Sequence, residues 1–164
     1  MPRISIIVAV AKNGAIGYEN RLLYRLRADM KRFKALTTGH TVLMGRKTFE
    51  SLPKGALPNR RNVVLTRSRK KFEGTEVFAS METALKHCEA DEEVFVIGGS
   101  SVYNEALPLA NRLYLTEVDD VPEKADTYFP EYDKKDWHET LRESFPADAD
   151  NERPYSFVTL ERIR

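Results

Sequence analysis

Four short runs of β-branched and apolar residues stand out in the first two thirds of the chain. They cover residues 4–11, 41–44, 62–66 and 93–97, and segments of mixed polarity separate them. Continuous apolar runs of about four to eight residues are typical of strands that are covered on both faces, as in a parallel sheet. The pattern therefore predicts four buried strands.

The segments between these runs have helical periodicity. In residues 28–36, Met30, Phe33 and Leu36 fall near one face and Lys31 and Arg32 fall elsewhere, so we expect the first face to pack on the sheet. Two more helices are expected, one capped by Ser80 and one over residues 101–107.

After residue 112 the pattern changes to strands without a long helix between them. The strand-like segments are 113–118, 137–144 and 155–163, and the last two are expected to pair antiparallel across the polar turn 147–153. The whole chain, residues 1–164, is therefore predicted to be one α/β domain. It would have a mostly parallel central sheet, an antiparallel C-terminal edge strand and flanking helices.

Charge and composition narrow the function classes. The net charge is only +1, which argues against general nucleic-acid binding, and the longest apolar run, 6–11, is far shorter than the ~20 residues of a membrane span. The single cysteine, Cys88, permits no intramolecular disulfide. With no secretion-like N-terminus, we expect a cytoplasmic protein that binds neither membranes nor nucleic acid.

Two glycine turns follow predicted strands and are candidate phosphate sites. The first turn is Gly45-Arg46-Lys47-Thr48, and the second comprises Ile97, Gly98, Gly99, Ser100, Ser101, Val102 and Tyr103. Backbone N–H groups at such strand-to-helix turns attract anions, and two of them can hold both ends of a dinucleotide. Glycine pairs are also common in ordinary turns, and neither turn matches the Rossmann or P-loop spacing.

A third basic cluster covers residues 66–71. Arg67 can pair with a phosphate in fork geometry, whereas residues 69–71 are better interpreted as a solvated basic turn. The histidines, His40, His87 and His138, have no metal-ligand spacing, so no metal site is expected.

Asp29 permits two interpretations. At the start of a helix it can be a cap. If it faces a pocket, its carboxylate can accept two parallel hydrogen bonds from an amidine-like ligand edge, and burial would raise its pKa.

Taken in order, these motifs resemble dihydrofolate reductase of the bacterial chromosomal type from end to end. The matching segments are 4–11 with Ile16, Gly17 and Asn20, then 28–34, 42–49, 51–53, 57–62, 97–103, 113–116 and 126–130. The resemblance implies NADPH-dependent reduction of 7,8-dihydrofolate to tetrahydrofolate in one-carbon metabolism. The implied partners are dihydrofolate and antifolate inhibitors, and we expect a monomer.

The resemblance also assigns substrate-binding roles. Asp29 would bind the 2-amino group and N3 of the pterin, with Thr116 supporting it from behind. The residues expected to line the rest of the substrate site are Val8 and Ala9 at the pterin, Phe33, Leu52 and Leu57 at the aminobenzoyl ring, and Arg60 at the glutamate α-carboxylate.

For the cofactor, the resemblance implies three groups of residues. They are Ala9, Ile16 and Asn20 at the nicotinamide; Ile97, Gly98, Gly99, Ser100, Ser101, Val102 and Tyr103 at the pyrophosphate; and Gly45, Arg46, Lys47, Thr48, Thr66 and Arg67 around the adenosine 2′-phosphate. The Gly98-Gly99 peptide is expected to be cis, as in the family.

Asp29, Tyr24 and Leu22 are the residues predicted to take part in catalysis. Tyr24 stands where the family usually has tryptophan, so its hydroxyl would hold a water beside the pterin, and the loop 13–24 would close over the nicotinamide. Two alternatives stay open: a pyrimidine reductase of riboflavin synthesis, which should not need Asp29, Phe33 and Arg60 together, and a non-catalytic nucleotide-binding module.

Overall fold

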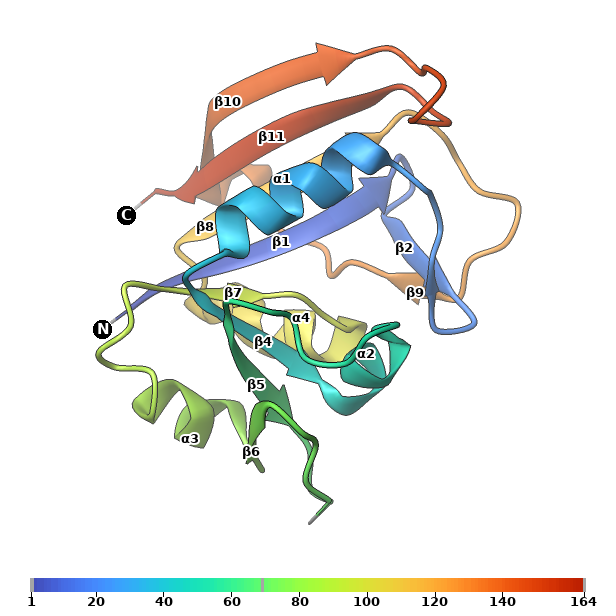
Figure 1. Cartoon of the computed structure of the whole chain (residues 1–164). Helices are drawn as coiled ribbons and strands as arrows, with labels where there is room; N and C mark the ends of the chain where they lie inside the picture. Colours follow the sequence, from blue (N-terminus) through green and yellow to red (C-terminus); the bar gives the residue numbers. More distant parts are fainter. Residues whose placement is uncertain (1, 69, 164) are drawn as a thin grey trace.

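A twisted eight-stranded sheet forms the centre of the protein in a computed structural model, which describes residues 2–68 and 70–163 (Figure 1). The strand order is β10-β11-β8-β1-β7-β4-β5-β6. The strands are β1 (Arg3–Ala11), β4 (Thr41–Gly45), β5 (Arg61–Leu65), β6 (Thr75–Phe78), β7 (Glu93–Val96), β8 (Arg112–Val118), β10 (Trp137–Phe145) and β11 (Tyr155–Arg162).

The strand directions confirm the predicted fold class. The six strands from β8 to β6 run parallel, whereas β11 pairs antiparallel with β8, and β10 pairs antiparallel with β11. The strand β6 was not predicted because it is short and lies at the edge, where only one neighbour covers it.

A second sheet has three strands, two of which lie within the segment 13–24 that the sequence predicted as a loop. It consists of β2 (Ala15–Tyr18), β3 (Arg21–Leu22) and β9 (Thr127–Tyr128). Strands of two to four residues are too short to show an alternating pattern, so these three strands were not predicted. The segment 13–24 is thereby tied to the distant segment 126–129 by backbone pairing.

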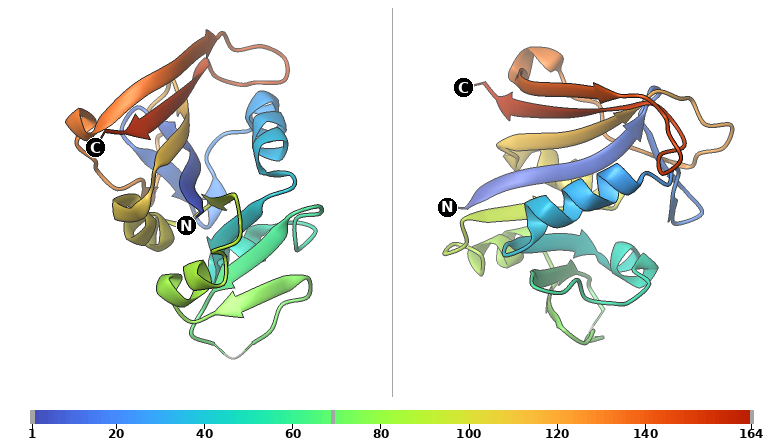
Figure 2. Two further views of the ribbon diagram at one scale, coloured as in Figure 1. Left: turned by 90° about the vertical axis from the view of Figure 1, so that its left-hand side faces the viewer. Right: turned by 45° about the horizontal axis from the view of Figure 1, so that its top comes forward.

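Helices cover both faces of the central sheet, as Figure 2 shows. They are α1 (Arg27–Thr37), α2 (Arg46–Ser51), α3 (Met81–Lys86) and α4 (Ser100–Ala106). Side chains of α1 and α2 pack in one buried cluster with Val42, Met44 and Phe95, and those of α3 and α4 pack in another with Ile6 and Leu113. No helix in the described ranges is long and apolar enough to cross a membrane.

The inner face of α1 differs from the prediction. Met30 is 64% exposed, whereas Asp29, Arg32, Phe33 and Leu36 are all partly buried. These four positions have the three- and four-residue spacing of one helical face. Placing Met30 inside and Arg32 outside was wrong, because two charged residues occupy inward positions and hide this face from a hydrophobicity pattern.

Candidate active site

Asp29 lies in the first turn of α1 and faces the sheet. The N-cap residue is Leu26, so the interpretation of Asp29 as a helix cap is wrong. Its Oδ1 accepts a hydrogen bond of 2.5 Å from Oγ1 of Thr116 on β8. Burial raises the pKa of the Asp29 carboxyl, and the Thr116 hydrogen bond and the Arg32 charge oppose that rise.

The raised pKa implies a stability prediction. A raised pKa in the folded state means that folding disfavours the ionised carboxylate, so stability is lost as the pH rises from the unfolded pKa through the folded one. Asp29→Asn keeps the shape and stays neutral. The variant should therefore melt at a higher temperature than the parent at pH 7 and at a similar temperature near pH 3, measured by thermal unfolding at both pH values. An equal difference at both would contradict the assignment.

The predicted pterin residues meet on two neighbouring strands. In the parallel pairing of β1 with β8, Ala9 lies beside Thr116 and Val8 beside Leu115. Ala9 is partly exposed, and Val8 is buried. The backbone thus places Ala9 next to the hydroxyl that binds Asp29, which is the arrangement expected of a small pocket with one carboxylate.

The residues expected at the aminobenzoyl ring also come together. Phe33, Leu52 and Leu57 are partly buried and pack against the same cluster of buried side chains. Nearby, Arg60 is held by Nε donating to the Pro58 carbonyl (2.9 Å) and Nη1 donating to Thr37 Oγ1 (3.1 Å). Burial lowers the pKa of Arg60.

The two glycine turns lie against each other. The Gly45 N–H donates to the Gly98 carbonyl (2.8 Å), and the Gly98-Gly99 peptide is cis, as expected. A Cβ on Gly45 would lie 3.2 Å from the Val102 side chain, and one on Gly99 would lie 3.5 Å from Thr48 Oγ1. The turns therefore form one shared surface, and a side chain at Gly45 would crowd it.

Both turns lead directly into helices with glycine N-caps. Gly45 caps α2 and Gly99 caps α4, and glycine has no side chain to occupy the amides of the first turn. This arrangement can receive an anion such as a pyrophosphate. Tyr103 differs from the prediction in one respect: its side chain is 4% exposed and its hydroxyl donates to the Ile7 carbonyl (3.0 Å), so the side chain serves the core.

The residues expected at the 2′-phosphate follow two paired strands: Arg46 follows β4, and Thr66 and Arg67 follow β5, whose last residue pairs with Gly45. Arg46 forms an ion pair with Glu50 one helical turn away (3.4 Å), Thr66 accepts a hydrogen bond from the Ser68 amide, and Arg67 is exposed. Lys70 and Lys71 are exposed, as expected of a solvated turn, and Arg69 lies outside the described residues.

The segment 13–24 contacts the glycine turn that begins at Gly45. Asn20 Nδ2 donates to the Lys47 carbonyl (3.3 Å), and the Glu19 amide donates to Asp126 Oδ2 (2.9 Å). Ile16 is buried in the core, whereas Leu22 is 79% exposed, so its side chain is not packed into the site in this conformation. Asp126 had no predicted role, because only the fold brings it to residue 19, 107 positions away.

Tyr24 has a protein partner that the sequence did not suggest. Its hydroxyl donates to Asp120 Oδ2 (2.8 Å), and burial, with Asp120 beside it, raises the pKa of Tyr24 to about 12. A phenol has one O–H, so while this bond exists the hydroxyl cannot also donate to a water beside the pterin. The hydroxyl thus attaches the loop to the segment after β8, and it could hold a water only as an acceptor.

Tyr24→Phe should accordingly affect the loop more than the chemistry. Loss of the Asp120 bond is expected to cost about 1 kcal/mol of unfolding free energy, measured by urea denaturation, and to leave the hydride-transfer rate within about twofold of the parent. A large loss of hydride transfer with unchanged stability would restore the water-holding interpretation.

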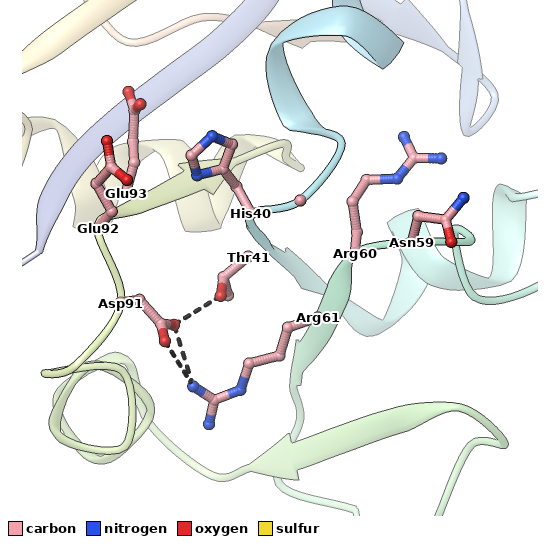
Figure 3. A pocket seen from close by; sticks show the side chains of 9 residues that line it. His40, Thr41, Asn59, Arg60, Arg61, Asp91, Glu92 and Glu93 are labelled. Atoms are coloured by element: carbon pink, nitrogen blue, oxygen red, sulfur yellow. Dashed lines mark hydrogen bonds and ion pairs between the residues drawn. The ribbon is translucent and has the colours of Figure 1, made fainter.

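The cavity shown in Figure 3 lies at the other end of the strands. It has a volume of about 340 Å³ and is lined by residues that begin β4, β5 and β7, together with the segments before them. At its floor, Arg61 and Asp91 form an ion pair of 3.0 Å, and Thr41 Oγ1 donates to Asp91 (2.6 Å). These paired groups connect the starts of β4 and β5 to the segment before β7, so they serve the scaffold.

A carboxylate beside a mostly parallel sheet, together with two adjoining glycine turns, is an arrangement typical of nucleotide-binding proteins of the α/β class. The model of the family described as dihydrofolate reductase matches residues 3–162. The chain is similar to dihydrofolate reductase type 3 of Salmonella typhimurium, with 46% identity over 162 residues, 98% of this chain and 99% of that protein. It is 40% identical to the dihydrofolate reductase of Bacillus subtilis (strain 168), over 97% of this chain and 94% of the relative.

The fold agrees with these relatives. A solved dihydrofolate reductase from Enterococcus faecalis, complexed with NADP(H) and RAB-propyl, superposes with a TM-score of 0.91 at 34% identity. The superposition covers 99% of this chain and 97% of that one. The chain therefore belongs to the dihydrofolate reductase family, as the sequence predicted.

Proposed function

We propose that the site around Asp29 reduces 7,8-dihydrofolate to 5,6,7,8-tetrahydrofolate, with NADPH as the hydride donor. Membership of the family confirms the predicted activity and cofactor. The observation that supports the site assignment is the carboxylate of Asp29, held by Thr116 beside Ala9 near the carboxyl end of β1. Family membership favours this activity over the two alternatives, a pyrimidine reductase of riboflavin synthesis and a non-catalytic nucleotide-binding module.

NADPH supplies the hydride when it is bound. The residues around the two glycine turns fit a dinucleotide of this kind. The adjoining turns at Gly45 and Gly98-Gly99 give an open backbone surface for the pyrophosphate. Arg46, Thr66 and Arg67 would bind the 2′-phosphate by charge-assisted hydrogen bonds. Asn20, which donates to the Lys47 carbonyl, would hold the loop over the nicotinamide end.

The residues around the substrate would bind and orient it. Asp29 would accept hydrogen bonds from the pterin's 2-amino group and N3 and would stabilise the protonated pterin electrostatically. Phe33, Leu52 and Leu57 would hold the aminobenzoyl ring, and Arg60, already fixed by Thr37, would pair with the glutamate carboxylate. Water would carry the proton to N5.

We further propose that the protein is a single domain that acts as a monomer in the cytoplasm, binds antifolate inhibitors in the same pocket and binds no nucleic acid. The near-neutral net charge of +1 supports the last point. Sedimentation of the purified protein with and without duplex DNA tests both the oligomeric state and this absence of binding.

The proposed activity is tested by following NADPH consumption with dihydrofolate as substrate. We expect turnover without added metal or flavin, and we expect turnover to persist with a chelator present. The pyrimidine substrate of riboflavin synthesis serves as the control. Reduction of that pyrimidine without reduction of dihydrofolate would contradict the proposal.

A further inference from the structure

Arg32 is a partly buried cation on the inner face of α1, one turn after Asp29. Its Nη1 donates to the Leu115 carbonyl on β8 (3.0 Å), and its Nη2 donates to Thr159 Oγ1 on β11 (3.4 Å). Two donors bonded to two strands fix the plane of the guanidinium. The side chain therefore holds its charge at one place in the fold.

Two aromatic rings complete this environment. The guanidinium carbon lies 4.5 Å from the ring centre of Phe157 and 5.7 Å from that of Tyr114. Stacking of this kind stabilises a partly desolvated cation. Burial lowers the pKa of Arg32, but the ordinary value is so high that the group stays charged at any pH at which the protein is folded.

The geometry brings this charge next to Asp29. Asp29 and Arg32 are three residues apart on one helix, where side chains are close neighbours. Both side chains reach β8 at consecutive residues, Asp29 at the Thr116 hydroxyl and Arg32 at the Leu115 carbonyl. Each has its own hydrogen-bond partner, so the cation acts on the carboxylate through space.

We propose that Arg32 is a positioning residue for this reaction: its fixed charge favours the ionised form of Asp29 and thereby sets the pH at which the site takes up a proton. Its effect on turnover rests on the proposed function. An ionised Asp29 is the form that can balance a protonated pterin. Without a nearby cation, burial alone would leave more of the carboxyl protonated near neutral pH.

Other titratable groups that face this pair do not supply a positive charge. Tyr103 on α4 and Tyr155 on β11 feel the Asp29 charge, which contributes to raising the pKa of each, and both are neutral at pH 7. Tyr114 on β8 and Glu143 on β10 favour the charged form of Arg32. Burial therefore raises the pKa of the Asp29 carboxyl, and the Thr116 hydrogen bond and the Arg32 charge oppose that rise.

The direct test is an NMR titration of the Asp29 carboxyl in the ligand-free protein. Arg32→Gln should raise the midpoint of the Asp29 titration by about one pH unit, because a neighbouring opposite charge is lost. Arg32→Lys keeps the charge and should move the midpoint by less than half as much. Lys31→Gln removes an exposed positive charge on the outer face of the same helix, and it should leave the Asp29 midpoint equal to that of the parent.

The second readout is the pH profile of hydride transfer under single-turnover conditions. With Arg32→Gln the fall of the rate at high pH should move upward by the same amount, because the site takes up its proton more readily. An unmoved Asp29 midpoint in Arg32→Gln, or an equal shift in Arg32→Lys, overturns the proposal. The titration needs no turnover, so it decides the role of Arg32 even if the proposed function fails.

Discussion

Asp29→Asn should reduce turnover of dihydrofolate at pH 7 by about 100-fold or more, because the neutral amide cannot balance a protonated pterin. The residual rate should rise toward acid pH, where the substrate brings its own proton. Single-turnover rates over a range of pH, with NADPH saturating, measure this effect. The carboxylate, and not the shape of the side chain, is what the substitution removes, because Asn keeps an oxygen for the Thr116 hydrogen bond.

The NADPH dissociation constant of Asp29→Asn is the internal control. Asp29 lies on α1, and the two glycine turns precede α2 and α4, so cofactor affinity should stay within about twofold of the parent. If the variant keeps the parent's rate and pH profile, Asp29 takes no part in the reaction.

Replacing Arg46 and Arg67 together by Ala should change the cofactor preference. Each well-formed charge-assisted hydrogen bond to a phosphate is worth about 1.5 to 3 kcal/mol, so the Michaelis constant for NADPH should rise at least tenfold. NADH has no 2′-phosphate, and its Michaelis constant should scarcely change. Because Glu50 already pairs with Arg46 and would compete with the phosphate for its charge, the contribution of Arg46 is expected to be smaller than that of Arg67.

A matched control for this pair is Lys70→Ala with Lys71→Ala, which removes two exposed charges from the same basic segment. This variant should leave both Michaelis constants near those of the parent. Equal losses for NADPH and NADH in the Arg46 and Arg67 variant would instead indicate a pyrophosphate role or a disturbed fold.

The strands β1, β4, β5 and β7 were predictable because burial on both faces leaves nearly uninterrupted apolar runs. The predicted strand 4–11 and the observed β1 (Arg3–Ala11) differ by one residue. The inner face of α1 was not predictable in the same way, because Arg32 is inward and Met30 outward. A hydrophobicity pattern cannot report a cation that is stabilised by two rings and a carbonyl from other strands.

In the site, too, features set by neighbouring residues were predictable, and contacts between residues far apart in sequence were not. The glycine turns are local, so their positions before helices were read from the sequence, whereas the cis peptide at Gly98-Gly99 was expected only from the family resemblance. The partners of Asp29 and Tyr24 lie 87 and 96 residues away, at Thr116 and Asp120. For Thr116 the resemblance gave the right partner, whereas it gave no indication that Asp120 would bind Tyr24.

The most direct test of the central claim is transfer of deuterium from NADPH labelled at C4 on the transferred face to dihydrofolate, followed by mass spectrometry and NMR of the product. We expect tetrahydrofolate with one deuterium at C6, formed by the parent and formed far more slowly by Asp29→Asn at pH 7. Unchanged dihydrofolate, or product without deuterium at C6, would contradict the proposed hydride transfer. Equal rates for the two proteins would contradict the place of Asp29 in it.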